Sequence, residues 1–293
     1  MTIKETHPDY ETLRDVPPME TTDYTDPRCP FCTDAFQKEA PPRRVPIDRI
    51  MARANAYFAA DDYAGAERHY DYWLREAEEG RDDRGLLFLY NEQMGLFRKT
   101  GQKEKALDAV SRAMRLLEKM EMTSSITAGT TYVNAGTVYK RFGMTEPSLA
   151  CFERALPLYE AHLAPDDGRL GGLYNNMALT LTDAGRFDEA EQSYRKALRV
   201  MERVPDGGPE RAITYLNLAN LEEARLGLEE AAERIEEYLN LARELLFDPS
   251  NPHDGNFAFV CEKCAPTFTY YGYFADGAEL ARTAQEIYKH ART

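Results

Sequence analysis

YNNMALTLTDAGRFDEAEQSYRKAL, residues 174–198, is the stretch that decides the fold. Ala178 is followed three residues later by Leu181, and four residues after that by Gly185; Ala190 lies five residues beyond this turn. A small residue within a helix lets a second helix pack closely against it. A glycine can adopt the left-handed conformation that ends a helix. The stretch therefore predicts two helices packed side by side around a tight turn at Gly185.

The same order of small, aromatic and turn residues recurs six times after residue 46. The turn positions are 61, 101, 143, 185, 226 and 272, which lie 40, 42, 42, 41 and 46 residues apart. One helix pair cannot bury its own apolar face, so such units must stack on one another. The pattern predicts an all-α stack of about six helix pairs, at about residues 47–80, 87–120, 129–163, 171–204, 212–246 and 256–290.

These six units resemble the tetratricopeptide repeat (TPR) over roughly residues 47–290, and we assign residues 47–293 to one solenoid domain. The usual repeat has about 34 residues, whereas a period near 42 is similar to the kinesin light chain variety. The resemblance implies a right-handed superhelical solenoid. It also implies an adaptor or scaffold that binds a protein or peptide partner in its concave groove.

Residues 1–46 carry no helical period and hold eight of the 16 prolines of the chain. A segment rich in proline, charge and threonine buries too little apolar surface to fold alone. We therefore expect an extended or disordered arm. Its aromatic residues, Tyr10, Tyr24 and Phe31, are enough for it to dock on a surface.

The composition narrows the classes of partner. The formal charge is −14 and the pI is near 5.0, whereas nucleic-acid binding requires clustered lysine and arginine. We therefore expect no nucleic acid and no anionic membrane surface as the main partner. No run of 18 apolar residues and no secretory signal is visible. Together with only five cysteines, this predicts a cytoplasmic protein. The oligomeric state is left open.

The resemblance also implies where a ligand binds, because the first helix of each repeat lines the concave groove. With the turn residue counted as position 15, the groove positions are about 2, 5, 6, 9, 12 and 13. Asparagines occupy such positions in four repeats, at Asn91, Asn134, Asn175, Asn176, Asn217 and Asn220. Cations occupy positions 12 and 13 of the second and third repeats, at Arg98, Lys99, Lys140 and Arg141.

Both groups of residues have two interpretations. An asparagine side chain can pair with either group of a peptide backbone, so a row of asparagines suits an extended ligand. The asparagines could instead be solvated or bond within the protein. The cations could bind a carboxylate or phosphate of the partner, or pair with acidic neighbours. The related carboxylate-clamp repeats carry lysine, asparagine and arginine at particular groove positions. This sequence does not reproduce that full set, so the resemblance does not imply their specificity for chaperone tails.

The cysteines form two CxxC pairs, Cys29–Cys32 in the arm and Cys261–Cys264 in the sixth repeat. Four thiolates in two such pairs are typical of a structural zinc site. The long separation of the pairs requires the arm to fold back along the solenoid. The alternative is that Cys261 and Cys264 are core residues, since free cysteine behaves as a small hydrophobe. For Cys151 we expect a core position.

We do not expect an enzyme or a cofactor other than this zinc. No nucleotide-binding, nucleophile-elbow or metalloprotease motif is present. The acidic pairs Asp61–Asp62 and Asp166–Asp167 precede predicted helices, where aspartate caps the helix. Two alternatives to the adaptor remain. One is a peptide-sensing regulatory receptor. The other is a zinc-stapled or self-inhibited scaffold whose arm lies in its own groove.

Overall fold

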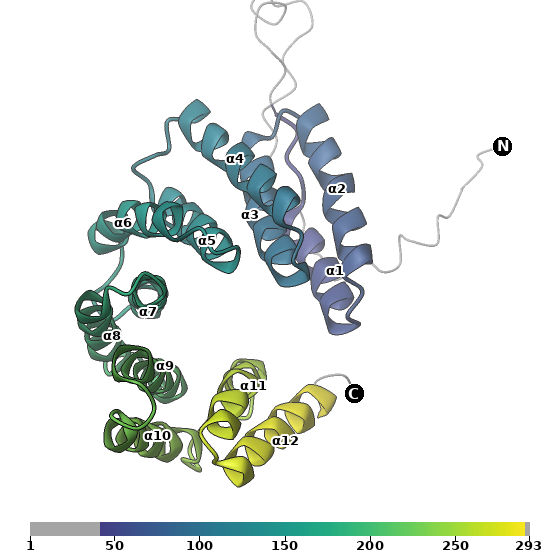
Figure 1. Ribbon diagram of the computed structural model, residues 1–293. Helices are drawn as coiled ribbons and strands as arrows, with labels where there is room; N and C mark the ends of the chain where they lie inside the picture. The colour runs from purple at the N-terminus through teal and green to yellow at the C-terminus, as the bar shows by residue number, and fades with distance from the viewer. Residues whose placement is uncertain (1–41, 291–293) are drawn as a thin grey trace, which may run out of the picture. The chain divides into compact units, whose positions relative to one another are not determined.

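A computed structural model of the chain describes residues 42–290, and the helices belong to one compact unit that begins at Arg44. The described residues form twelve helices and no strand (Figure 1). The predicted arm, including Tyr10, Tyr24 and Phe31, lies outside the described residues except for its last five. The helices are α1 (Ile47–Ala59), α2 (Tyr63–Glu79), α3 (Asp83–Thr100), α4 (Lys103–Lys119), α5 (Ile126–Arg141), α6 (Thr145–His162), α7 (Gly168–Asp183), α8 (Phe187–Met201), α9 (Gly208–Leu226), α10 (Ala232–Leu246), α11 (Gly255–Tyr270) and α12 (Phe274–His290).

Successive helices pair as the sequence predicts, giving an all-α solenoid of six repeats. Short turns join the two helices of a pair, and Gly101, Gly143, Gly185 and Gly272 all have a positive φ there. The fifth turn differs by one residue. Gly227, with φ of 83°, ends α9 in place of the predicted Leu226, because glycine adopts this conformation at little cost.

Small residues allow the close packing within each pair. A Cβ atom built on Gly136 of α5 would lie 2.4 Å from the ring of Phe152 on α6. The equivalent Ala178 of the fourth repeat has no exposed surface, and neither do Ala190 and Tyr194 of α8. The residues that decide the fold in the sequence therefore lie at the contact between the two helices.

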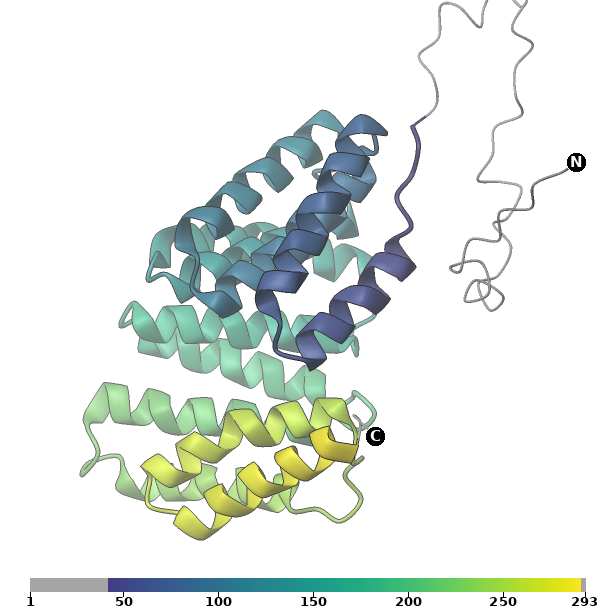
Figure 2. The same cartoon turned by 90° about the vertical axis from the view of Figure 1, so that its right-hand side faces the viewer.

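From the second pair onward, the first helix of each pair lies toward the inner side of the stack. Within the described unit, α3 contacts α5, α5 contacts α7, α7 contacts α9 and α9 contacts α11, whereas the second helices pack mainly on the first helices next to them. Figures 1 and 2 show the pairs as successive layers in chain order. We call the exposed side of α3, α5, α7, α9 and α11 the inner face.

Aspartates and one serine begin five of the helices. Asp62 accepts a hydrogen bond from the backbone N–H of Gly65, and Asp167 accepts one from that of Arg169. These bonds confirm that the acidic pairs cap helices, because the first backbone N–H groups of a helix have no partner within it. Asp82 caps α3 and also accepts a bond of 2.9 Å from the backbone N–H of Val45.

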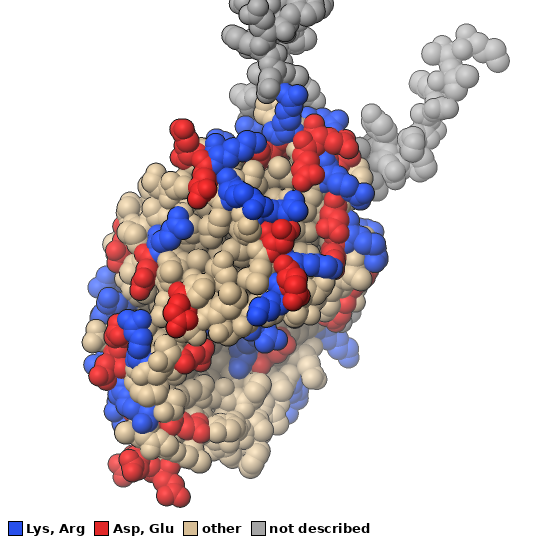
Figure 3. Space-filling model, turned by 45° about the horizontal axis from the view of Figure 1, so that its top comes forward, with Lys and Arg blue, Asp and Glu red and all other residues tan. Residues whose placement is uncertain are grey.

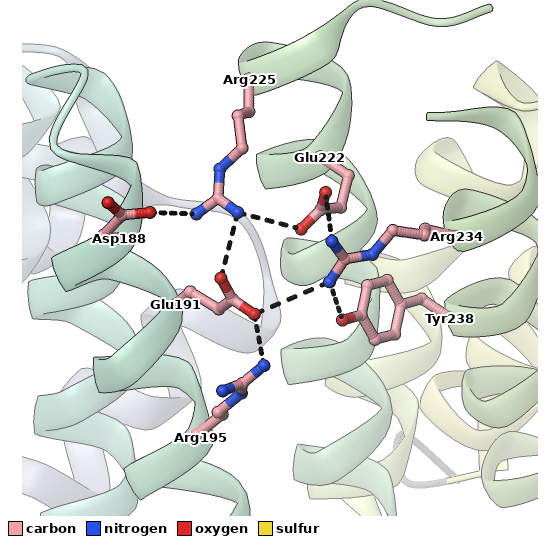
Figure 4. A network of polar contacts seen from close by, with 7 residues as sticks. All are labelled: Asp188, Glu191, Arg195, Glu222, Arg225, Arg234 and Tyr238. Atoms are coloured by element: carbon pink, nitrogen blue, oxygen red, sulfur yellow. Dashed lines mark hydrogen bonds and ion pairs between the residues drawn. The ribbon is translucent and has the colours of Figure 1, made fainter. Parts of the chain in front are cut away.

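A network of ion pairs joins the fourth and fifth repeats (Figure 4). Its centre is the Glu222 carboxylate on α9, whose side chain has no exposed surface. Arg234 of α10 lies 3.2 Å from this carboxylate and Arg225 lies 3.8 Å from it. Arg225 continues to Glu191 of α8 at 3.1 Å. The network spans three helices, so it fixes α8 against the next repeat.

Candidate binding face

Three polar side chains on the inner face join the second and third repeats. The side-chain nitrogen of Asn91 on α3 donates to the Thr131 hydroxyl on α5, over 3.1 Å. Asn134 of α5 donates in return to the side-chain oxygen of Asn91, over 2.8 Å. Thr131 is fully buried and both asparagines are half-buried. These two asparagines therefore bond to each other across the repeat boundary.

The fourth and fifth repeats carry the same three residue types at equivalent positions. Asn175 of α7 donates to the Thr214 hydroxyl on α9, over 2.8 Å. Asn217 stands where Asn134 stands in the third repeat, but the second bond is not made. The side-chain oxygen of Asn175 and the side-chain nitrogen of Asn217 are buried without a partner in the described structure. One acceptor and one donor are thus left open between α7 and α9.

The remaining two predicted asparagines also have partners within the protein, and only the second is exposed. Asn176 is half-buried; its nitrogen donates to the Gly172 carbonyl, and its oxygen lies 3.5 Å from the Lys140 ammonium. Asn220 is exposed and accepts a hydrogen bond of 3.0 Å from the Tyr271 hydroxyl. The structure therefore places all six asparagines on first helices, with different degrees of access.

The four predicted cations divide into two classes. Arg98 of α3 and Lys140 of α5 are half-buried, and burial lowers the pKa of both side chains. Lys99 and Arg141 are exposed. The Lys99 ammonium lies 5.0 Å from the centre of the Tyr63 ring. No carboxylate of the described chain pairs with Arg98 or Lys140 within 4.0 Å, although the charge of Asp183 acts on Lys140 and opposes the lowering of its pKa.

Three residues of α11 form an exposed stripe on the inner face. They are not among the binding residues predicted from the sequence. Phe259 is 47% exposed and Tyr270 is 66% exposed, and the exposed Lys263 lies between them. Lys263 occupies position 6 of the sixth repeat, the position that holds asparagine in the three preceding repeats. Extending the position count to the last repeat would have found it.

An apolar pocket lies beside this stripe, between α11 and α12. Its volume is about 580 Å³, and Tyr270 and Phe274 are its exposed aromatic residues. The other lining residues are small or aliphatic apart from one threonine: Ala265, Pro266, Thr269, Gly277, Ala278 and Ala281. The pocket is wide and open, and its lining suits an apolar group of a ligand.

Charges of both signs are interspersed on the face drawn in Figure 3, and the acidic excess forms no continuous patch there.

None of the helices from α1 to α12 combines the length and the apolar character needed to cross a lipid bilayer.

The second predicted site, the pair Cys261 and Cys264, lies in the core of the sixth repeat. Burial raises the pKa of the Cys261 thiol to about 11 and also raises that of Cys264. Zinc binds the thiolate, so burial works against binding at these two residues. Among residues 42–290 no group of three or more histidine, cysteine or acidic side chains could hold a metal ion. Cys29 and Cys32 lie outside the described residues, and the shared zinc site stays a prediction.

Cys151 is buried, as predicted.

Comparisons with known proteins agree with the geometry. A family model described as tetratricopeptide repeat matches residues 170–244, from α7 into α10. The match shows tetratricopeptide repeats in this part of the chain. No curated protein sequence matches the chain.

Several solved structures share the TPR fold. BtubC (BKLC) from P. vanneervenii has 18% sequence identity and a TM-score of 0.52, over 80% of this chain and 92% of that chain. The apo form of RapI has 11% identity and a TM-score of 0.56, over 83% and 97%. A putative kinesin light chain with TPR-like repeats from Podosopora anserina has 14% identity and a TM-score of 0.48, over 69% and 94%. At such identities the likeness to BtubC and RapI shows the fold alone.

Proposed function

We propose that this TPR protein is an adaptor or scaffold that binds a peptide or an extended protein segment on its inner face. The observation that carries this proposal is the α11 stripe. Phe259 and Tyr270 are large aromatic side chains with 47% and 66% of their surface exposed. Exposed aromatic side chains beside a pocket are typical anchors for a partner.

The asparagines take two roles in this proposal. Asn220, which is exposed, and Asn176, which is half-buried, would pair with the ligand backbone, exchanging their present partners for it. Asn91, Asn134, Asn175 and Asn217 would hold neighbouring first helices in register, because their bonds run between α3 and α5 and between α7 and α9. Lys99 and Arg141 would contact the ligand at the edge of the face.

A peptide selection tests the proposal. Random peptides displayed on phage are selected against the full chain, and the dissociation constants of the enriched peptides are measured by calorimetry. The variant Phe259→Ala removes the anchor. The control Tyr72→Ala removes a tyrosine of α2 that is 49% exposed and lies outside the inner face.

We expect Phe259→Ala to weaken binding about tenfold, since loss of a central aromatic contact costs roughly 1–2 kcal/mol. We expect Tyr72→Ala to leave the affinity unchanged. Equal affinity of the wild type and the Phe259→Ala variant for every enriched peptide would remove α11 from the binding site and sink the proposal.

A further inference from the structure

The second helix of the sixth repeat lacks an apolar side chain that the other five repeats have. The side chain lies nine residues after the turn residue, at position 24 of the repeat count. In the first five repeats it is larger than alanine and at most 4% exposed: Tyr70, Val110, Phe152, Tyr194 and Ile235. In the sixth repeat the position holds Ala281, which is half-buried.

The third repeat shows what the side chain at position 24 contacts. The Phe152 ring lies against position 8 of the first helix, where a Cβ atom built on Gly136 would be 2.4 Å from the ring. In the sixth repeat, position 8 is Ala265 and position 24 is Ala281, and both line the pocket between α11 and α12. The pocket of about 580 Å³ therefore lies where the larger side chain is missing.

The polar groups of the pocket lining are already bonded within the protein. The Thr269 hydroxyl donates to the Ala265 carbonyl over 3.0 Å. The Tyr270 hydroxyl donates to the Glu223 carboxylate of α9 over 2.5 Å. The pocket therefore favours an apolar group, which needs no hydrogen-bond partner when it is buried. The bond to Glu223 also holds the exposed Tyr270 ring in place, so this wall of the pocket is formed before a ligand binds.

The pocket is continuous with the inner face. Pro266, Thr269 and Tyr270 all line it, and they occupy positions 9, 12 and 13 of the sixth repeat. The resemblance to the TPR assigns these positions to the groove. A peptide on the inner face can therefore place one side chain in the pocket without leaving that face.

We propose that this pocket binds one aromatic side chain of the peptide, which takes the place that Phe152 has in its own repeat. The inference rests on the proposed binding of a peptide to the inner face, and it specifies a residue that the peptide contains. The chain itself supports the choice of an aromatic residue, because three of the five side chains at position 24 are aromatic and have no exposed surface: Tyr70, Phe152 and Tyr194. Aromatic side chains also bury the largest apolar area in interfaces.

Two variants close the pocket in different ways. Ala281→Phe supplies the missing side chain from the protein itself. Ala278→Glu adds a carboxylate at an exposed position of the pocket wall, and the equivalent residue is already a glutamate in the first and fourth repeats, at Glu67 and Glu191. The control Ala281→Ser keeps the residue small and leaves the pocket open.

Random dodecapeptides displayed on phage are selected in parallel against the full chain and the three variants, and the enriched sequences are compared. We expect an aromatic residue at one fixed position in the peptides selected by the wild type and by Ala281→Ser. We expect no such preference with Ala281→Phe or Ala278→Glu. The melting temperature of Ala281→Phe should be no lower than that of the wild type, because every other repeat has a larger side chain at this position.

Calorimetry then measures the contribution of the aromatic residue. Its replacement by alanine in a peptide selected by the wild type should weaken binding to the wild type about tenfold. The same replacement should change binding to Ala281→Phe by less than about twofold, because the pocket of this variant is already filled.

Three results would overturn the pocket assignment. The first is an aromatic preference that both pocket variants retain, and the second is a wild type that selects no aromatic residue. The third is a wild-type dimer in sedimentation velocity that both pocket variants dissociate, because the occupant would then be the exposed Phe274 of a second copy. The proposed function is tested separately: peptides without an aromatic preference whose binding still depends on Phe259 would refute the pocket assignment alone.

Discussion

Removing Arg225 from the ion network between the fourth and fifth repeats should destabilise the protein far more than removing an exposed arginine of the same network. The variant Arg225→Met keeps the aliphatic bulk and removes the guanidinium. Arg225 is 19% exposed and contacts Glu222, Glu191 and Asp188 (Figure 4). The loss leaves the fully buried Glu222 carboxylate with Arg234 alone, at 3.2 Å.

The expected cost follows from these contacts. Removing one partner of a buried ion pair costs about 3–5 kcal/mol, because the other charge stays buried and unpaired. Arg234 remains beside Glu222, and Glu191 keeps Arg195 at 2.6 Å. We therefore expect a loss of about 2–3 kcal/mol in the free energy of unfolding. Arg195 is 61% exposed, so Arg195→Met should cost about 0.5 kcal/mol.

Urea unfolding followed by far-ultraviolet circular dichroism measures both costs. A third variant, Glu222→Leu combined with Arg225→Met, removes the buried charge together with its partner. It should be more stable than Arg225→Met alone, since an apolar replacement of a buried pair leaves no unpaired charge. If Arg225→Met and Arg195→Met cost the same, or if the double variant is the least stable of the three, the network does not act through the burial of Glu222.

Two further predictions concern the core. Gly136→Ala should lower the free energy of unfolding by about 1–3 kcal/mol, because the added methyl group overlaps the Phe152 ring. Gly95→Ala should instead raise it by about 0.5–1 kcal/mol, because nothing lies within 4 Å of the added group and alanine favours the helix. Equal melting temperatures for the two variants would contradict the packing described. Burial raises the pKa of the Cys151 and Cys261 thiols from 9.0 to about 11, so their contribution to stability is complete below pH 9 and is lost as the pH rises through about 11. Urea unfolding at several pH values measures this loss. When both cysteines are replaced by valine, the free energy of unfolding should fall less steeply as the pH rises from 9 to about 11. The same pH dependence in the wild type and the variant would contradict the raised pKa of the two thiols.

The helix pairs could be predicted because their signals are local. A glycine at a turn and small residues at fixed distances from it are sufficient to place a tight pair of helices, as at Gly185 and Ala178. The fifth turn was displaced by one residue because Leu226 stands where the other repeats have their turn residue. The chain reverses at Gly227, where a positive φ is tolerated.

The partners of the polar residues could not be predicted from the same pattern. Whether Asn134 faces a ligand or bonds to Asn91 depends on the exact separation of α3 and α5, which the repeat spacing does not define. The same limit explains why Asn217, at the equivalent position, has an unpaired nitrogen. Glu222 shows no sequence signal of its burial, since its cations come from other turns and helices.

Crosslinking from the two faces of one repeat tests the central claim most directly. A photoreactive benzoylphenylalanine replaces Asn176 on the inner face in one variant and the exposed Gln192 of α8 in another. Each variant is irradiated with a selected peptide, and the products are identified by mass spectrometry. The account predicts a peptide adduct from position 176 and none from position 192. An adduct from position 192 with none from position 176 would place the ligand on the outer helices and contradict it.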